Sequence, residues 1–420
     1  MSQNKSSKSN KVLLAFSGGL DTSYCIKYLI HEKNLEVHTA IVNTGGFSEE
    51  ELQAIEQKAI DLGSFHHTTL EVTKEYYDKI IKYLIFGNVL RNNTYPLSVS
   101  AERTYQAIAL ANYATKIEAD YIAHGSTGAG NDQVRFDLVF QLIAPQIEIL
   151  TPIREQKLSR EQEVAYLKSH GVELDWEKAK YSINKGLWGT SVGGAETLTS
   201  HKPLPEEAYP SQLVNNGNET VTLEFENGEI CGINNKKMNP VKVIQTLEDI
   251  ANKYAIGRDT HVGDTIIGIK GRVGFEAAAA SIIIKAHHTL EKHTLSKWQM
   301  YWKEQLSNWY GMFIHESQYF EPVMRNIETF LEDSQKNVTG KVFVELAPYR
   351  FVIEGIESDF DLMKSDFGEY GEMNKNWSGD DVKGFTKILG NSLQIFNQVQ
   401  NKVQTKAQNK AQQKQQKNGK

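Results

Sequence analysis

The stretch AFSGGLDTS, residues 15–23, follows the short apolar run 12–14. An apolar run before two adjacent glycines predicts a buried strand that turns tightly into a helix. The amides of a first helical turn, together with the hydroxyls of Ser17, Thr22 and Ser23, suit an anion. The Walker pattern GxxxxGK[ST] is absent, so no lysine of that motif is available for the phosphates. We therefore expect a strand–loop–helix unit that binds a phosphate-containing ligand.

Asp21 is the unusual member of this loop. A carboxylate beside a phosphate repels it unless a cation lies between them, and Mg²⁺ prefers oxygen ligands. The residues therefore favour a magnesium ion between Asp21 and the phosphate oxygens. The alternative, in which Asp21 only caps the helix after a Gly-Gly turn, stays open at this point.

Strand-like and helix-like segments alternate from Lys11 to about Gly171. Strands are expected at 12–16, 36–42, 65–72 and 121–123, and helices at 22–31, 48–62, 74–85 and 101–117. This alternation predicts a mostly parallel sheet with helices on both faces. Ligands of such sheets bind beyond the carboxyl ends of the strands. The loop at 15–23 and the glycine-rich turn after 121–123 should therefore share one rim.

Beyond Gly171 the pattern becomes antiparallel. Hairpins are expected at 222–233, around Asn227-Gly228, and at 341–355, with helices at 240–254 and 276–306 and a strand at 265–270. We predict an α/β protein with five segments. These are a disordered N-terminus (1–10), a nucleotide-binding domain (11–170), an α+β substrate and multimerisation domain (171–365), a C-terminal oligomerisation arm (366–400) and a disordered Lys/Gln-rich tail (401–420).

Composition narrows the class of protein. The net charge of -6 argues against a dedicated nucleic-acid surface. The longest apolar runs fall short of the roughly 18–20 residues of a membrane span. Two cysteines are too few for a disulfide framework or a cysteine-based zinc site. We expect a cytoplasmic protein without nucleic-acid or membrane partners.

A second motif, HGSTGAGNDQVRFDL, spans residues 124–138. Its three glycines allow a tightly folded loop around a ligand. Thr127, Asn131 and Asp132 offer a hydroxyl, an amide and a carboxylate, which suit the two charged ends of an amino acid. Arg135 has the fork geometry that binds a carboxylate or a carbonyl oxygen. The pattern favours an amino-acid site on the rim of the sheet.

The first motif resembles the pyrophosphate loop of the ATP pyrophosphatases, and the second resembles the corresponding block of the argininosuccinate synthases. The resemblance runs in segment order from about Val12 to Ile388. It implies an adenine nucleotide α-hydrolase-like domain followed by a synthetase domain and a C-terminal helical arm. The implied reaction joins citrulline to aspartate with ATP and Mg²⁺, through citrullyl-AMP, and releases AMP and diphosphate in arginine biosynthesis. A homotetramer is also implied.

The resemblance implies a role for each matching position. ATP would be bound by Ala15, Phe16, Ser17, Gly18, Gly19, Leu20, Asp21, Thr22, Ser23, Val42 and Gly125. Aspartate would be bound by Thr127, Asn131 and Asp132, and citrulline by Tyr95, Ser100, Asn131, Arg135, Ser182 and Ser191. Asp21, Asp132 and Arg135 are the expected catalytic residues, and Asp132 would orient the aspartate amine.

The chain also departs from the family pattern. Ala129 replaces a lysine, and Gly263 and Phe275 stand where the family has a glutamate and a tyrosine that contact citrulline. Asp264 is the candidate to supply the lost carboxylate. Residues 43–46 and 102–104 differ from the family as well.

These departures leave three alternatives open. One is a ligase of the same mechanism that acts on an N-acylated citrulline, and another is a catalytically impaired nucleotide-binding regulatory protein. The third is a tRNA-thiolating enzyme, although Cys25 and Cys231 lie far apart in the sequence. His287, His288 and His293 lack the spacing of a helical metal pair. The stripe Trp298, Trp302 and Trp309 is expected in the core or at a subunit interface.

Overall fold

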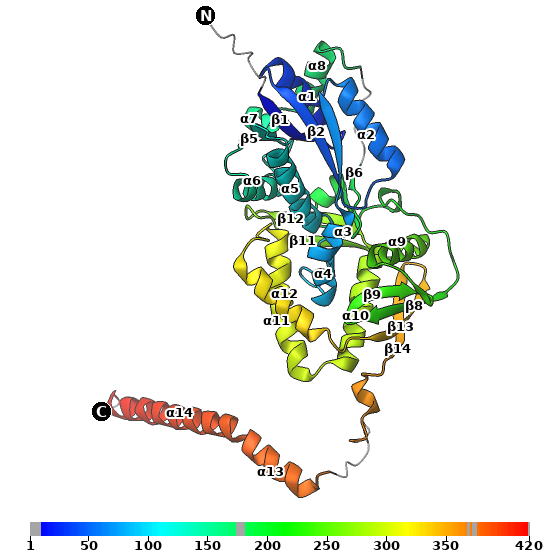
Figure 1. The fold of residues 1–420 in the computed structure, drawn as a ribbon. Helices are drawn as coiled ribbons and strands as arrows, with labels where there is room; N and C mark the ends of the chain where they lie inside the picture. Colours follow the sequence, from blue (N-terminus) through cyan, green and yellow to red (C-terminus); the bar gives the residue numbers. More distant parts are fainter. Residues whose placement is uncertain (1–9, 174–180, 368–369, 372–375, 419–420) are drawn as a thin grey trace, which may run out of the picture. The chain divides into compact units, whose positions relative to one another are not determined.

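The structure is a computed structural model that describes residues 10–173, 181–367, 370–371 and 376–418 (Figure 1). The chain divides into two compact units, one up to Phe360 and one from Asp361 onward. Residues 1–9 of the expected disordered N-terminus lie outside the described residues. Within the described ranges, no helix is long and apolar enough to cross a membrane.

A five-stranded parallel sheet forms the first half of the larger unit (Figure 1). Its strands lie in the order β3-β2-β1-β4-β5. Their bounds are β1 Lys11–Ala15, β2 Glu36–Asn43, β3 His66–Glu71, β4 Tyr121–Ala123 and β5 Glu148–Leu150. The order reverses between β1 and β4, so the chains that leave these neighbouring strands open a crevice at the carboxyl edge. Both glycine-rich segments leave the sheet at this point, and the predicted α/β fold class is confirmed.

Helices cover both faces of this sheet. They are α1 Leu20–His31, α2 Glu49–Asp61, α5 Ser98–Lys116, α6 Asp132–Ile143, α7 Pro152–Gln156 and α8 Arg160–Ser169. Val12 and Leu14 of β1 pack in one cluster with Leu29 of α1 and Leu167 of α8. Leu13, pointing to the other face, packs in a cluster with residues of α5 and α6. The sequence at 48–51 forms the expected capping box, with Ser48 Oγ accepting from the Glu51 amide at 3.2 Å.

The expected helix at 74–85 is a more irregular helical segment. It consists of α3 Thr73–Tyr76, the π-helical turn η1 Tyr77–Ile81 and α4 Lys82–Phe86. Most of its residues are buried in the largest apolar cluster, together with the helix α10 Ala278–Thr294. The π-helical turn η1 shifts the angular positions of the side chains that follow it, so that residues of α4 also face the core.

Two antiparallel sheets form the second half of the larger unit. One has the order β10-β9-β8-β13-β14, with β8 Glu219–Glu226, β9 Glu229–Ile233, β10 Lys236–Lys237, β13 Gly340–Ala347 and β14 Arg350–Glu357. The other has the order β11-β12-β7-β6, with β6 Ser182–Asn184, β7 Thr190–Gly193, β11 Arg258–Asp264 and β12 Lys270–Glu276. Both predicted hairpins, around residues 227–228 and 348–349, are present.

Four helices accompany these sheets: α9 Pro240–Ala251, α10 Ala278–Thr294, α11 Lys297–His315 and α12 Pro322–Ser334. Two predictions were wrong here. Residues 265–269 form the turn between β11 and β12, closed by a Thr265 amide that donates to the Ile269 carbonyl at 2.8 Å. The expected single helix at 276–306 is two helices, because Ser296 caps α11 with Gln299 in a capping box.

The second unit contains the short turn η5 Leu362–Lys364 and the helices α13 Gly379–Leu389 and α14 Asn391–Asn418. The structure differs from the prediction of a disordered tail at 401–420, since α14 continues to Asn418. Alanine, glutamine and lysine are good helix formers, so the backbone can be helical even where little apolar surface is available. Apolar side chains of α13 and α14, among them Phe385, Ile388 and Phe396, are exposed.

Candidate active site

A cavity of about 1150 Å³ opens where the parallel sheet meets the sheet formed by β6, β7, β11 and β12. Most of the sequence-predicted site residues line it: Ala15, Phe16, Ser17, Gly19, Leu20, Asp21, Thr22, Val42, Tyr95, Ser100, Gly125, Thr127, Asn131, Asp132, Arg135, Ser182, Ser191 and Asp264. Gly18 and Ser23 do not line it. The fold thus gathers residues from Ala15 to Asp264 around one space, while their ligand roles remain predictions.

We call residues 15–23, which the sequence predicts to bind ATP, the ATP loop. Gly18 has φ +76°, a left-handed conformation that glycine adopts readily, and it turns the chain from β1 into α1. Ser23 Oγ donates to the Gly19 carbonyl at 2.7 Å, which explains why Ser23 is buried away from the cavity. Ser17 Oγ and Thr22 Oγ1 lie 3.4 Å apart. The loop therefore presents hydroxyls and the positive end of α1 to the cavity.

Lys58 of α2 supplies a cation that the sequence reasoning missed. Its Nζ donates to the Gly18 carbonyl at 2.7 Å, so the ammonium lies against the back of the ATP loop. Partial burial lowers the pKa of Lys58 below its ordinary value. The two residues are 40 positions apart, and only the helical phase of α2 could have indicated that its single lysine faces the loop.

Asp21 faces a second carboxyl group, Glu163 of α8. Burial first, and then the charge of Asp21, raise the pKa of Glu163 to about 8. Glu163 Oε2 is buried and has no hydrogen-bond partner in the described part of the chain. At neutral pH the raised pKa keeps Glu163 protonated beside Asp21, and a divalent cation held in part by phosphate oxygens would take the place of this proton. Within the described ranges, no cluster of three or more His, Cys, Asp or Glu side chains could hold a metal by itself.

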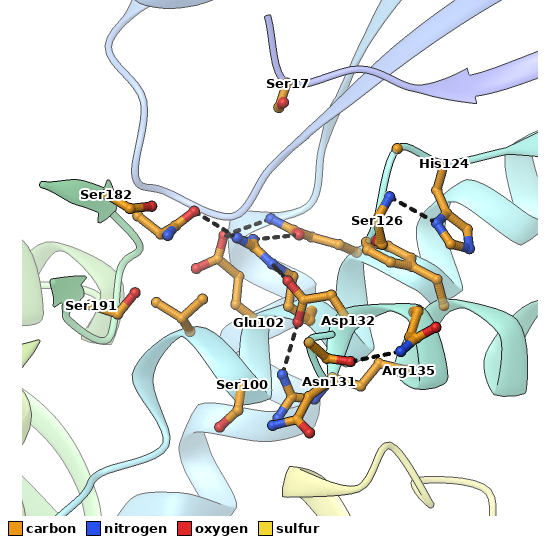
Figure 2. Close-up of a pocket in the computed structure, with 18 of the residues that line it drawn as sticks. Ser17, Ser100, Glu102, His124, Ser126, Asn131, Asp132, Arg135, Ser182 and Ser191 are labelled. Atoms are coloured by element: carbon orange, nitrogen blue, oxygen red, sulfur yellow. Dashed lines mark hydrogen bonds and ion pairs between the residues drawn. The ribbon is translucent and has the colours of Figure 1, made fainter. Parts of the chain in front are cut away.

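The segment 124–138, here called the Gly-rich block, runs from the end of β4 into α6. His124 Nδ1 accepts from the Ser126 amide at 3.2 Å, so its Nε2 carries the proton that is donated to Asp137 at 2.9 Å. Arg154 donates to the other oxygen of Asp137 at 2.7 Å. These contacts fix the start of the block against β4 and α7, and Figure 2 shows the bond between His124 and Ser126.

A charged cluster lies at the start of α6. Asp132 accepts from Arg135 at 2.9 Å and from Arg103 of α5 at 3.2 Å (Figure 2). Burial would raise the pKa of Asp132, but the two guanidinium groups outweigh it and hold the pKa below its ordinary value. Arg103 also donates to Asn184 of β6 at 3.1 Å. The sequence did not indicate a role for Arg103, although it lies one helical turn after Ser100.

We call the part of the cavity lined by Tyr95, Ser100, Asp132, Arg135, Ser182 and Ser191 the amino-acid end. Ser100 and Ser191 are buried, whereas Ser182 is exposed at the mouth (Figure 2). Asn131 Oδ1 accepts from the Ile266 amide at 2.8 Å, which ties the Gly-rich block to the turn after β11. Contacts between segments more than 100 residues apart therefore build this end.

The departures from the family pattern have different structural settings. Gly263 lines the cavity, and its strand neighbour Asp264 is exposed, with its carboxylate bound by Lys270 at 2.7 Å. Phe275 is 2% exposed and packs on Tyr95 with ring centroids 5.3 Å apart, so it belongs to the core behind the cavity. Ala129 is exposed on the Gly-rich block.

Glu102 carries a carboxyl group that is buried beside this end. Its exposed fraction is 1%, and Gln106 donates to its Oε1 at 2.6 Å. Burial raises the pKa of Glu102. A β-carbon at Gly186 would lie 2.1 Å from Glu102 Oε2, so glycine is required there for the loop after β6 to approach α5.

The weaker sequence candidates lie elsewhere. His287 is fully buried, and its ring nitrogens lie 2.6 Å from Asn88 Oδ1 and 2.9 Å from Gln335 Oε1. It is a core histidine. The side chains of Trp298, Trp302 and Trp309 are more than half exposed on α11, so the expectation of a core position is wrong for this stripe and the interface alternative remains.

The chain is similar to known proteins over most of its length. A family model described as the arginosuccinate synthase N-terminal HUP domain matches residues 11–173, and one described as the C-terminal domain matches residues 181–396. The argininosuccinate synthase of Sulfurisphaera tokodaii is 35% identical over 393 residues, which span 93% of this chain and 100% of that protein. The enzyme of the same name from Methanocaldococcus jannaschii is 33% identical over 91% of this chain and 97% of its own. The ammonia-dependent NAD synthetase from Campylobacter jejuni matches with a TM-score of 0.28 at 16% identity, over 41% of this chain and 69% of that one.

Proposed function

The chain belongs to the argininosuccinate synthase family, and we propose that its own residues carry out the complete ligation of citrulline and aspartate at the expense of ATP, releasing AMP and diphosphate. Membership of the family makes it an ATP-dependent ligase. The single observation that carries the detailed proposal is the cavity in which the ATP loop and the amino-acid end share one space.

The ATP loop would hold the phosphates through Ser17, Thr22 and the positive end of α1. Lys58, bound to the Gly18 carbonyl, adds positive charge behind the loop. Asp21 and Glu163 would hold a magnesium ion, whose charge neutralises the departing diphosphate when it is bound. The proposal needs no covalent nucleophile from the chain, because the substrates supply the nucleophiles.

The amino-acid end would position the two other substrates. Arg135 and Ser191 would place the ureido group of citrulline so that its oxygen attacks the α-phosphorus of ATP, which forms citrullyl-AMP and expels diphosphate. The aspartate amine would then attack the ureido carbon, and AMP would leave with that oxygen. Asp132, held by Arg103 and Arg135, would orient the amine. Positioning of this kind can supply several kcal/mol of the barrier reduction, on the order of 7–11 kcal/mol in favourable intramolecular systems.

The test is an assay with ATP, Mg²⁺, aspartate and citrulline that measures AMP and diphosphate. We expect both products in equal amounts and only when all substrates are present. ADP and phosphate in place of AMP, or no product with any citrulline, would contradict the proposal. The matches over nearly the whole chain do not favour the regulatory-protein alternative or the N-acylated substrate.

A homotetramer and a cytoplasmic location are also part of the proposal. The exposed apolar residues of α13 and α14, and the exposed tryptophans of α11, are surfaces that a second copy could cover. Cys25 and Cys231 are free thiols, which suits a reducing compartment. Light scattering of the full chain should give four copies. A chain without residues 401–420 should also form particles of four copies. Dissociation of this shortened chain would contradict the view that the oligomerisation arm ends near residue 400.

A further inference from the structure

Two buried histidines line the amino-acid end, and no motif of the sequence indicated them. His261 lies in β11 and His315 at the end of α11, and each is 6% exposed. The His261 ring stacks on Tyr95 with centroids 5.2 Å apart. Arg135 donates to the His315 carbonyl at 3.0 Å and to its Nδ1 at 3.3 Å. We call His261 and His315 the histidine wall.

Each imidazole of the histidine wall has a buried ring nitrogen without a partner in the described part of the chain. His315 Nε2 and His261 Nδ1 are buried and make no hydrogen bond within the described ranges. Because a guanidinium only donates, His315 Nδ1 must be an acceptor, and Nε2 of the neutral ring carries the proton. A buried N–H without an acceptor is unfavourable. Because His315 lines the cavity, a ligand that placed an acceptor atom at His315 Nε2 would satisfy this donor.

Arg91 and Arg135 act on these rings, while the charge of Glu316, the residue after His315, acts on Arg91. Burial first, and then Arg135 and Arg91, lower the pKa of His315 to about 2, and burial and Arg91 lower the pKa of His261. Both rings are therefore neutral at physiological pH. Arg91 donates to the main-chain oxygen of Asp264 at 3.2 Å, and its Nε is buried without a partner in the described part of the chain.

The nearby carboxylates are already bound. Asp132 is held by Arg103 and Arg135, and Asp264 is held by Lys270. Glu316 accepts from Gln318 at 3.1 Å, and its charge acts on Arg91. At position 263 a β-carbon would lie 2.6 Å from His261 Nε2, so the imidazole occupies the space that a side chain would need. A substrate ammonium facing the histidine wall would meet arginines and an N–H donor. A substrate carboxylate would meet the N–H of His315 Nε2 and the positive charge of Arg91 and Arg135.

We propose that the histidine wall is a specificity-determining subsite that binds a carboxylate of the citrulline-type substrate and disfavours an ammonium group at the same place. This inference rests on the proposed function, since it concerns the amino-acid end of the same cavity. The carboxylate has two possible chemical sources. One is the α-carboxylate of citrulline, the substrate of the proposed function. The other is the terminal carboxylate of a dicarboxylic acyl group on the citrulline nitrogen, which the matches do not favour and which the second ligand pair below tests.

The test compares two variants with the wild-type chain. His261→Phe keeps the stacking on Tyr95 and removes both ring nitrogens. His315→Asn keeps an acceptor near the position of Nδ1 for Arg135 and removes the Nε2 donor. His288→Phe is the control, because His288 lies in α10 and does not line the cavity. Dissociation constants are measured by calorimetry, with a non-hydrolysable ATP analogue present, so that turnover is not needed.

Two ligand pairs distinguish the two sources of the carboxylate. Citrulline against citrullinamide tests the α-carboxylate, and N-succinylcitrulline against N-acetylcitrulline tests the acyl carboxylate. We expect wild type and His288→Phe to prefer the carboxylate member of one pair by about tenfold to a hundredfold, as for a hydrogen bond to a charged group. The preference should fall to within about twofold in His261→Phe and His315→Asn, with the affinity for aspartate unchanged.

Equal affinity for both members of both pairs in the wild-type chain would overturn the inference. So would a preference that persists in both variants. Failure of the proposed function is a separate result, because it appears as absence of AMP in the turnover assay while the binding preferences remain measurable.

Discussion

Main-chain groups and hydroxyls build the ATP loop, whereas ion pairs and buried histidines build the amino-acid end. In the ATP loop, Ser23 and Thr22 bind the carbonyl of Gly19 within the same turn of chain. At the amino-acid end, Arg135 binds Asp132 three residues away and His315 at a separation of 180 residues. The hydroxyl contacts of the first region lie within one turn of chain, whereas the second region depends on ion pairs and long-range contacts.

This difference indicates where the site is sensitive to substitution. A local loop is fixed by glycine conformation and by the start of a helix, so loss of one hydroxyl leaves most of its amides in place. A charged cluster depends on each member, because removing one partner leaves the others buried without compensation. Substitutions at the amino-acid end should therefore have the larger effects.

The largest effect is expected for Asp132→Asn. It leaves Arg103 and Arg135 without their shared carboxylate, so kcat/KM for aspartate should fall by about a hundredfold, in the range seen for loss of one preorganised electrostatic contact. Steady-state kinetics with each substrate varied in turn would measure this. Asp249→Asn, at an exposed position of α9, is the control. Unchanged turnover and an unchanged KM for aspartate would show that Asp132 does not orient the amine.

A smaller effect is expected for Lys58→Met at the other region. Loss of the ammonium behind the ATP loop should raise the KM for ATP by about tenfold, as for one charge-assisted contact, with the KM for aspartate unchanged. Lys58→Arg should retain most of the affinity. If the KM values for ATP and aspartate rose together, Lys58 would be a structural residue for the whole cavity instead of a contributor to the ATP loop.

The pH dependence of stability should identify the acid pair beside the ATP loop. The pKa of Glu163 is about 8 in the folded chain, above its unfolded value near 4.5. Folding therefore retains a proton that the unfolded chain releases, and the stabilisation present at low pH is lost as the pH rises from about 4.5 through 8. The melting temperature of Glu163→Gln minus that of wild type should be larger at pH 8.5 than at pH 5.5. Both are measured without Mg²⁺ and ATP. Parallel melting curves across this pH range would contradict the assignment.

The smallest effect is expected for Phe275→Tyr. Phe275 lies behind Tyr95 and does not line the cavity, so a hydroxyl at this position would be buried and would not reach a ligand. The KM for citrulline should change by no more than about twofold, while the melting temperature should fall because a buried hydroxyl costs about 1–3 kcal/mol when unpaired. A clear fall in the KM for citrulline would show instead that position 275 reaches the substrate.

The sequence predicted the ATP loop better than the amino-acid end, for a physical reason. Strand, Gly-Gly turn and helix start all lie within residues 11–31, so local rules were sufficient for them. The Gly-rich block could also be placed on the rim, because the alternation of strands and helices determines which edge both loops share. Residues such as Ser182 and Ser191 were placed by resemblance alone.

Long-range contacts were beyond sequence reasoning. Nothing local marks His315 as a partner of Arg135, or Ile266 as a donor to Asn131. The break at Ser296 in the expected long helix could have been predicted, because Ser296 and Gln299 have capping-box spacing. It was missed because the apolar pattern continues on both sides of Ser296. The turn at 265–269 was mistaken for a strand because its isoleucines outnumber its turn residues.

The central claim is that the cavity brings the ureido oxygen of citrulline to the α-phosphorus of ATP. It is tested most directly with citrulline carrying ¹⁸O in the ureido group, followed by mass spectrometry of the products after a single turnover. The account predicts one ¹⁸O atom in AMP and none in diphosphate. Unlabelled AMP, with the label retained in the amino-acid product or found in diphosphate, would contradict it.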